Sequence, residues 1–314
     1  MKKPLSVIII LGFLIPAKAQ DFKIDAAEQG LKQNVHWVKR TWYKPIKNGE
    51  AWAADKSSVP NIYLRPNQLI EYSKEGKMKA VMDYLPGTVD QSGPTRRYVW
   101  EGKKLKSEAF ENAGYVLMNS ATYTYDPEGH ETRKETRRGP GDQFGFTQNN
   151  SLESVWKGSL LTKQTLRDEK GALLNETSFT YDANGRKVRE DYYPVSFYSG
   201  KTFEYDAKGN LIKETDLDKS GQPNMVRTYV YNSSNRIVKS TMTAYSKGIK
   251  TEERLITTTW NSQGDKTGEV HNDGKKTISY GWQHSYDSKG NRIQTVHLKD
   301  GVAIEVEVLE LRYY

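Results

Sequence analysis

Cysteine is absent from all 314 residues of the chain. Without thiols the protein can form neither a disulfide nor a thiolate zinc site, and it has no cysteine nucleophile. Beyond residue 19 no segment approaches the roughly 20 consecutive apolar residues that a membrane-spanning helix needs. The sequence therefore predicts no helical membrane span, and it predicts that stability comes from packing and hydrogen bonding alone.

Apolar residues are also scarce, at 36% of the chain, with a mean hydropathy of -0.80. Tyrosine, in contrast, occurs 20 times. This balance favours β-strands that are wet on one face, and it argues against a thick core covered on both sides. Basic side chains are in excess, with a formal net charge of +8. Because acidic residues are interspersed with them, we expect a solvated strand face rather than a nucleic-acid site.

The first 19 residues have the pattern of a secretory signal peptide. Lys2 and Lys3 precede an apolar stretch from Leu5 to Pro16, and Ala17-Lys18-Ala19 supplies the small residues of a cleavage site. The mature chain is predicted to begin at Gln20. We expect an exported protein, in the periplasm or outside the cell.

One short phrase recurs along the rest of the chain: an aromatic residue, then Asp or Asn, then two variable residues, then Gly or Asn. From Tyr181 onward the aromatic positions recur every 24 to 29 residues, and a fixed period is typical of a repeat architecture. The predicted repeat positions are Tyr125, Asp126, Gly129, Tyr181, Asp182, Gly185, Tyr205, Asp206, Gly209, Tyr231, Asn232, Asn235, Trp260, Asn261, Gly264, Tyr286, Asp287 and Gly290.

Each copy of the phrase predicts one β-hairpin. Residues two apart before the turn, such as Phe179 and Tyr181, share one face of a strand. The Asp or Asn oxygen can accept backbone N–H groups two residues on, and the final Gly or Asn tolerates the left-handed conformation that ends the turn. A β-branched residue three positions later, such as Val188, then begins a return strand.

The hairpins predict an all-β protein in which tandem repeats form an elongated, curled or spiral antiparallel sheet. Degenerate copies at Tyr72, Trp100 and Trp156 extend the period toward the N-terminus. We expect residues 20–120 to hold degenerate repeats with a possible short helix from Asp25 to Lys32, continuous with a repeat array over residues 121–314. Because open twisted sheets seldom exceed about ten strands, the sheet must bend into a coiled ribbon or partly closed barrel with its aromatic stripe inward.

The phrase resembles a known repeat. Tyr181-Asp182-Ala183-Asn184-Gly185-Arg186, with its spacing to Tyr205-Asp206, is similar to the YD repeat of the RHS and teneurin families, and the resemblance extends from about Tyr123 to Gln294. It implies hairpins wound into a spiral sheet at or beyond the cell envelope, with roles in carbohydrate or surface binding. Encapsulation of a cargo, as in the large members, is not expected from a chain of this length.

No unique catalytic constellation stands out. His271, His284 and His297 are evenly spaced, but no His pair at i, i+2 or i, i+4 supports a metal site. Asp216 to Gly221 imitates half of a calcium loop, yet Arg227 occupies the position of the bidentate acid. A carboxylate that recurs in every repeat is usually a fold element. We therefore predict no catalytic, cofactor-binding or metal-binding residues, and no cofactor.

These observations predict a non-enzymatic binding or scaffold module at the bacterial cell envelope, because repeat arrays make extended binding surfaces. The partner is expected to be an envelope glycan or protein and not nucleic acid. The alternative is an envelope hydrolase that acts on polysaccharide through scattered acids such as Asp182, Asp206 and Asp287. A third possibility is that the terminal strand from Val306 to Tyr314 pairs with the sheet edge of another protein. The tryptophans that we predict as a possible glycan platform are Trp37, Trp42, Trp52, Trp100 and Trp282.

Overall fold

The computed structural model describes residues 26, 29, 31–32, 35–57, 67–84, 92–143, 145, 147–196 and 198–314. The predicted signal peptide lies outside the described residues, as does half of the predicted helix from Asp25 to Lys32. Of its described residues, Ala26 and Gln29 lie in turns and Leu31 and Lys32 have no regular structure. Regular structure in the described part is β-strand: β1 (Val35–Asn48), β2 (Ala51–Asp55), β3 (Asn67–Tyr72), β4 (Met78–Tyr84), β5 (Ser92–Glu101), β6 (Lys104–Glu111), β7 (Leu117–Tyr125), β8 (Glu131–Arg138), β9 (Asn150–Lys157), β10 (Leu160–Asp168), β11 (Leu173–Tyr181), β12 (Lys187–Tyr193), β13 (Tyr198–Tyr205), β14 (Leu211–Asp218), β15 (Pro223–Tyr231), β16 (Ile237–Ser246), β17 (Ile249–Trp260), β18 (Lys266–Asn272), β19 (Thr277–Tyr286), β20 (Arg292–Lys299) and β21 (Val302–Tyr313).

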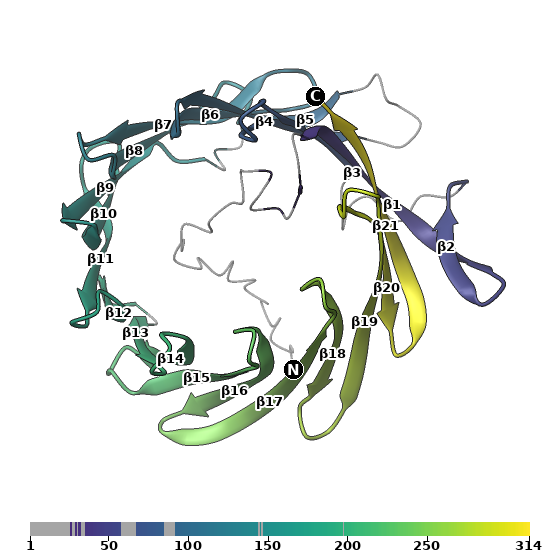
Figure 1. The fold of residues 1–314 in the computed structure, drawn as a ribbon. Coiled ribbons are helices and arrows are strands. Elements are labelled where there is room, and N and C mark those ends of the chain that lie inside the picture. Colours follow the sequence, from purple (N-terminus) through teal and green to yellow (C-terminus); the bar gives the residue numbers. More distant parts are fainter. Residues whose placement is uncertain are drawn as a thin grey trace, which may run out of the picture.

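The strands form one closed antiparallel barrel, which corrects the predicted elongated, curled or spiral sheet. Consecutive strands pair from β3 to β21, and β1 pairs with both β3 and β21, so that 20 strands complete a ring (Figure 1). The all-β prediction is confirmed. Closure was missed because the β1–β21 contact joins residues at opposite ends of the chain, and no periodicity in the sequence reports such a contact.

The terminal strand is not available for pairing with another protein, which corrects the third sequence-based hypothesis. Residues from Val306 to Tyr313 pair with β1 on one side, and residues from Val302 to Val308 pair with β20 on the other. Ion pairs reinforce the closure, because Arg40 lies 3.0 Å from Glu307 and Lys39 lies 3.5 Å from Glu310. Barrel closure hides strand edges that an open sheet would expose.

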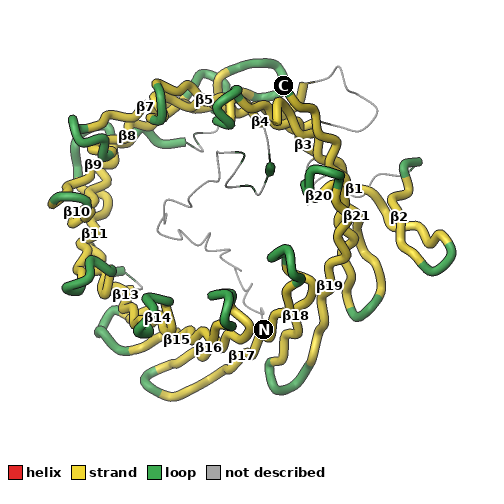
Figure 2. Tube along the Cα trace, viewed as in Figure 1, coloured by secondary structure: helices red, strands yellow, loops and turns green. Residues whose placement is uncertain are grey.

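Strand β1 leaves the ring at its C-terminal half. From Lys44 to Asn48 it pairs with β2, which has no other strand partner among the described residues. Figures 1 and 2 show β2 outside the ring. Trp52 and Ala54 of β2 pack against a buried cluster that includes Val296 and Val306. The side of the strands that carries Val296 and Val306 is therefore the outer face of the barrel.

The opposite side of each strand is the inner wall, and the pairing register carries this assignment around the whole ring, because directly opposed residues share a face. Trp42 is opposite Glu307, Phe203 is opposite Glu214, and Tyr123 is opposite Lys134. By this register the aromatic residues that precede the repeated turns point inward. The predicted inward aromatic stripe is thus present, although in a closed barrel.

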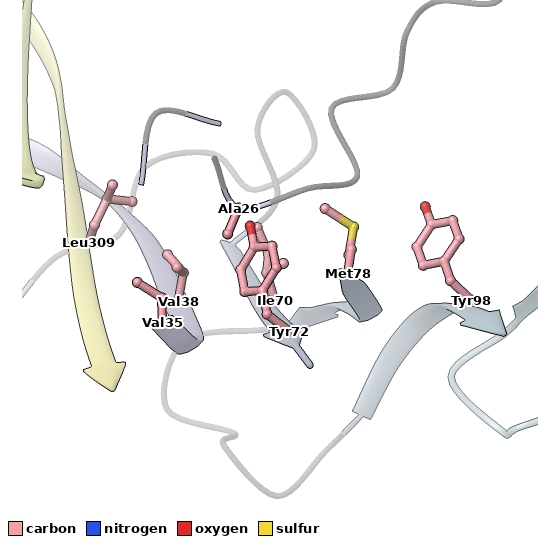
Figure 3. Packing of buried hydrophobic residues seen from close by; sticks show 8 residues of the cluster. All are labelled: Ala26, Val35, Val38, Ile70, Tyr72, Met78, Tyr98 and Leu309. Atoms are coloured by element: carbon pink, nitrogen blue, oxygen red, sulfur yellow. The ribbon is translucent and has the colours of Figure 1, made fainter. Parts of the chain in front are cut away.

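The largest buried apolar cluster lies on the inner wall beside the seam between β1 and β21. Figure 3 shows Ile70 and Tyr72 together, with Ala26 and Met78 next to them. Tyr72 and Met78 are almost completely buried, with exposed fractions of 0% and 1%. Elsewhere the wall has few fully buried apolar side chains, as expected for strands that are wet on one face.

The repeated turns are held by their acidic residue. Asp182 Oδ1 accepts the backbone N–H groups of Asn184 and Arg186, both at 2.9 Å, and the Gly185 N–H donates to the Asp182 carbonyl. Gly185 has a φ of 74°, and Asn235 occupies the equivalent position of another turn with a φ of 55°. These are the conformations that glycine adopts freely and asparagine tolerates.

The inward aromatic residue of each turn connects neighbouring hairpins. Tyr181 of β11 donates its hydroxyl hydrogen bond to the carbonyl of Leu161, at the start of the preceding strand β10, at 2.7 Å. Tryptophan makes the same contact with its indole N–H where it replaces tyrosine. The other bonds of this type run from Tyr125 to Leu105, Tyr205 to Lys187, Tyr231 to Leu211, Trp100 to Met78, Trp156 to Glu131 and Trp260 to Ile237.

Candidate functional site on the inner wall

The five predicted platform tryptophans are divided between the two faces of the barrel. Trp37 is opposite the outward-facing Glu71, and Trp52 lies on β2 outside the ring. Trp42, Trp100 and Trp282 belong to the inner wall. The structure therefore does not bring all five together, and only an inner subset can share a site.

Trp42 and Trp282 approach each other through a histidine. His297 is the cross-strand neighbour of Trp282, and its ring centroid lies 5.4 Å from that of Trp42. The Lys266 ammonium lies 5.2 Å from the centre of the Trp282 ring, within the range of a cation–π contact. Trp42 is buried whereas Trp282 is partly exposed. Of these two tryptophans, Trp282 is therefore the one that a ligand in the lumen can reach.

Trp100 is placed differently. Its indole N–H donates to the Met78 carbonyl at 2.7 Å, and the Lys77 ammonium lies 5.4 Å from its ring centre. It also packs against the buried cluster beside the seam. Its side chain is thus tied into the wall, on the other side of the seam from Trp282.

A cluster of buried charges lies on the inner wall of β13, β14 and β15. The Lys201 ammonium is 2.8 Å from Glu214 and 2.9 Å from Asp216. The Arg227 guanidinium is 3.3 Å and 3.0 Å from the same two carboxylates. Only 8% of the Glu214 side chain and 11% of the Asp216 side chain are exposed. Asp216 thus binds two cations of the chain, which is not the arrangement of a calcium ligand.

Burial and charge pairing act in opposite directions on the cations of this cluster. Burial alone would lower the pKa of Lys201, but hydrogen bonds to Glu214 and Asp216 outweigh it and hold the pKa above its usual value. The pKa of Arg227 is likewise raised, because the charge of Asp216 overcomes the desolvation. Both side chains therefore stay charged at neutral pH.

A neighbouring group of side chains continues the polar wall along β12. Tyr192 donates to Glu190 Oε2 at 2.7 Å, and Lys187 binds the other oxygen of the same carboxylate. The Lys187 ammonium also lies 5.4 Å and 5.0 Å from the ring centres of Phe179 and Phe203. Cations, carboxylates and aromatic rings are therefore interleaved on this part of the wall.

The histidines do not gather. His271 contacts Glu269 at 3.1 Å, His284 lies between Thr295 and the Lys266 carbonyl, and His297 packs against Trp42. Within the described ranges no three His, Asp or Glu side chains are arranged to hold a metal ion.

The turn carboxylates Asp182, Asp206 and Asp287 all have a lowered pKa. For Asp182 the main cause is the backbone N–H of Arg186, and for Asp206 it is the side-chain amide of Asn210. For Asp287 hydrogen bonds led by the Tyr313 hydroxyl outweigh the desolvation. Each of these groups is ionised and engaged in its own turn, which is the role of a fold element.

The outer face has a different chemistry. Half-exposed ion pairs follow one another around the ring, and threonine and serine fill many of the positions between them. Five such pairs are Glu71–Lys79, Arg97–Glu111, Arg133–Glu153, Lys163–Glu176 and Glu204–Lys213.

Buried tyrosine hydroxyls predict a loss of stability at high pH. Burial, followed by the hydrogen bond to Glu190, raises the pKa of Tyr192 above its usual value of 10.0, and burial with the bond to Asp287 raises the pKa of Tyr313 to about 12. Below pH 10 both the folded and the unfolded chain hold these protons, so the hydroxyls contribute their full stabilisation to the folded state. Above pH 10 the unfolded chain releases them first, and stability falls as pH rises.

The variant Tyr192→Phe tests this pH dependence. We expect the slope of unfolding free energy against pH above pH 10 to become shallower, by up to about 1.4 kcal/mol per pH unit before solvent screening reduces it. Urea titrations at several pH values measure the slope. Tyr115→Phe is the control, because Tyr115 is 62% exposed and should leave the slope unchanged. An identical slope in Tyr192→Phe and the parent chain would contradict the prediction.

Among the described residues no helix is long and apolar enough to cross a bilayer. No protein-family model and no curated protein matches the chain. Two solved structures of a toxin, TcdB2–TccC3 with Cdc42 and TcdB2–TccC3 without its hypervariable C-terminal region, are each 12% identical to it, with TM-scores of 0.45 and 0.46. Each match covers 89% of this chain and only 16% of the toxin chain.

A porin-like protein from Bacteroides uniformis is also similar. It is 10% identical, with a TM-score of 0.35, and the match covers 88% of this chain and 98% of that protein. Identities and scores this low do not transfer a function from any of these proteins. The function has to be argued from the residues of this chain.

Proposed function

We propose that the protein is an exported barrel with water on both faces that acts as a binding or scaffold module at the cell envelope, with its ligand on the inner wall. The chemistry of the outer face carries the first part of this proposal. Barrels that span a membrane alternate apolar side chains outward with polar side chains inward. Here the alternation is reversed, because aromatic rings point inward and ion pairs such as Arg133–Glu153 and Lys163–Glu176 point outward.

The energy of that arrangement opposes insertion into a bilayer. An Arg or Lys on the lipid face of a barrel costs about 2–4 kcal/mol near the bilayer midplane. The outer face has such residues on several strands, including β5, β8, β10 and β14. The summed cost far exceeds what the few outward valines, such as Val99 and Val230, would recover.

Flotation with liposomes tests this part of the proposal. Mature protein prepared without detergent is expected to remain monodisperse and to stay at the bottom of a density gradient when it is mixed with liposomes of envelope lipids. Protein that aggregates without detergent, or that floats with the liposomes and resists carbonate extraction, would overturn it.

The inner wall supports the second part of the proposal. Barrels of 16–18 strands already leave an aqueous channel, so a ring of 20 strands is too wide for its own side chains to fill. The wall presents partly exposed aromatic rings beside ammonium groups, as at Trp282 and Lys266. Rings of this kind stack on the apolar faces of sugars, and the cations suit acidic groups. We therefore propose an envelope glycan with acidic groups as the ligand.

Tryptophan fluorescence can test the glycan proposal. Titration with acidic envelope oligosaccharides is expected to change the emission of the parent protein, and Trp282→Ala should weaken binding by about fivefold, because one stacked ring contributes about 1 kcal/mol. Trp52→Ala is the matched control, since Trp52 lies outside the ring. Equal affinities for Trp282→Ala and the parent chain, or no binding of any such glycan, would reject this ligand.

The alternative of an envelope hydrolase has less support. It depended on Asp182, Asp206 and Asp287, and each of these carboxylates accepts hydrogen bonds within its own turn. No observation on the described inner wall favours proton transfer by these three groups.

A further inference from the structure

The inner wall beside the seam holds residues from the N-terminal end of the mature chain. Ala26, Leu31 and Lys32 all contact this part of the wall, although the strands that they contact come from both ends of the sequence. The contacts are of two kinds, an apolar pocket and a pair of hydrogen bonds to backbone atoms.

The pocket receives Ala26. This residue is 4% exposed and belongs to the buried cluster formed by β1, β3, β4, β5 and β21, where Figure 3 shows it beside Tyr72 and Ile70. Its backbone N–H donates to the Gly76 carbonyl at 2.9 Å, in the turn between β3 and β4. Leu31 packs against the edge of the same cluster. A small side chain fits here, and a charged one would be buried without a partner.

The hydrogen bonds hold Lys32. The Lys32 N–H donates to Asn291 Oδ1 at 2.5 Å, and Asn291 Nδ2 donates to the Lys32 carbonyl at 3.3 Å. Asn291 is fully buried, at 0% exposure. One side-chain amide therefore recognises both backbone groups of a single residue, in the way that an adjacent strand would.

This use of Asn291 is not part of the repeat. In an equivalent turn the Asn210 amide donates hydrogen bonds to Asp206 of the same turn and to Asn235 of the next repeated turn. The Asn291 amide also bonds Asp287 of its own turn, but in addition it reaches Tyr313 and Lys32.

The two anchor points lie on opposite sides of the seam. Gly76 follows β3, the neighbour of β1, and Asn291 precedes β20, the neighbour of β21. Ala26 and Lys32 are therefore held on opposite sides of the junction on which barrel closure depends. The C-terminal Tyr314 makes a similar crossing, since its hydroxyl donates to the Tyr72 carbonyl at 2.6 Å.

We propose that this part of the inner wall is a peptide-binding site, and that its resident ligand is the N-terminal segment of the same chain, which straps the barrel closed. The ligand class is an extended peptide with a small residue at the pocket and a free backbone N–H at the position of Lys32. The proposal does not depend on the glycan ligand or on the location of the protein.

The test uses the full mature chain and a fluorescent peptide of residues 22–34. In the double variant Ala26→Glu and Lys32→Pro the tethered segment can no longer fill the pocket or donate to Asn291, so the site should be vacant. We expect this variant to bind the free peptide at least about tenfold more tightly than the parent chain does, because the parent site is already occupied in cis. Its melting temperature should fall by at least about 2 °C.

Two controls make the result specific. A peptide with an N-methyl group on the nitrogen of Lys32 lacks the N–H that Asn291 accepts and is expected to show no binding. If circular dichroism shows that the double variant has lost its strands, Lys32→Pro alone replaces it. Because Ala26 then still fills its pocket and only Asn291 is vacant, the expected gain in peptide affinity is about threefold. Failure of the folded variant to bind the peptide, or equal binding of the N-methyl peptide, overturns the proposal.

Discussion

Replacement of Glu214 by alanine is expected to lower the free energy of unfolding by about 3–5 kcal/mol. The Glu214 side chain is only 8% exposed and faces both Lys201 and Arg227. Its removal leaves two partly buried cations with Asp216 as their shared carboxylate, so desolvation is no longer fully balanced by charge pairing. Urea unfolding followed by circular dichroism measures the loss.

The same pair of strands supplies the control. Glu204 and Lys213 form an ion pair on the outer face of β13 and β14, with side chains that are 56% and 40% exposed. Glu204→Ala is expected to cost no more than about 1 kcal/mol, because water already solvates both charges. Similar losses for Glu204→Ala and Glu214→Ala would show that the two faces of the wall do not differ in burial.

A second variant that lacks Glu214 separates the loss of charge pairing from the loss of side-chain packing. Lys201→Met combined with Glu214→Leu removes one charge of each sign and keeps the side-chain volume. It is expected to be more stable than Glu214→Ala, because the buried cation left in excess by the single substitution is no longer present. A double variant less stable than Glu214→Ala would contradict the charge-pairing account.

Cysteines at positions 39 and 310 are expected to form a disulfide within one molecule. Lys39 and Glu310 are Cα partners across the seam between β1 and β21, and their side chains lie on the outer face. The chain has no cysteine of its own, so no other thiol competes. The bond would close a loop that spans nearly the whole chain, and it should raise the free energy of unfolding by about 2–4 kcal/mol.

Electrophoresis without reductant detects this cross-link, and urea unfolding before and after reduction measures its effect. Cysteines at positions 39 and 213 are the matched control, because Lys213 lies on the outer face of β14, far from the seam in Figure 1. An open spiral sheet would give no monomeric cross-link in either variant. That outcome at positions 39 and 310 would refute barrel closure.

Much of the local structure could be predicted from the repeated phrase. The Asp182 oxygen and Gly185 backbone do in the turn what their chemistry predicts, and Asn235 adopts the left-handed conformation that it shares with glycine. The period of two along each strand also placed the aromatic residues on one face, and the need to bend so many strands indicated that this face points inward. These features depend on residues close together in the chain.

The buried charge cluster was within reach of the sequence but was missed. Lys201 is two residues before Phe203, so it shares the face of the strand that carries the aromatic residues. Glu214 and Asp216 are likewise two apart and alternate with outward residues, which places them on the same face. Their low exposure could not be foreseen in the same way. It depends on how closely the inner side chains of three strands approach one another, and that distance is set by the curvature of the closed wall.

The sequence by itself determined the hairpin, because a turn and its two strands are encoded within one repeat by residues that are adjacent or two apart. Only the tertiary structure decided that the hairpins close into a barrel, that β2 lies outside it, and that Ala26 and Lys32 lie against its inner wall. The physical reason is that each of these contacts joins segments from distant parts of the chain, and their free energy depends on the curvature accumulated over 20 strands rather than on any local pattern.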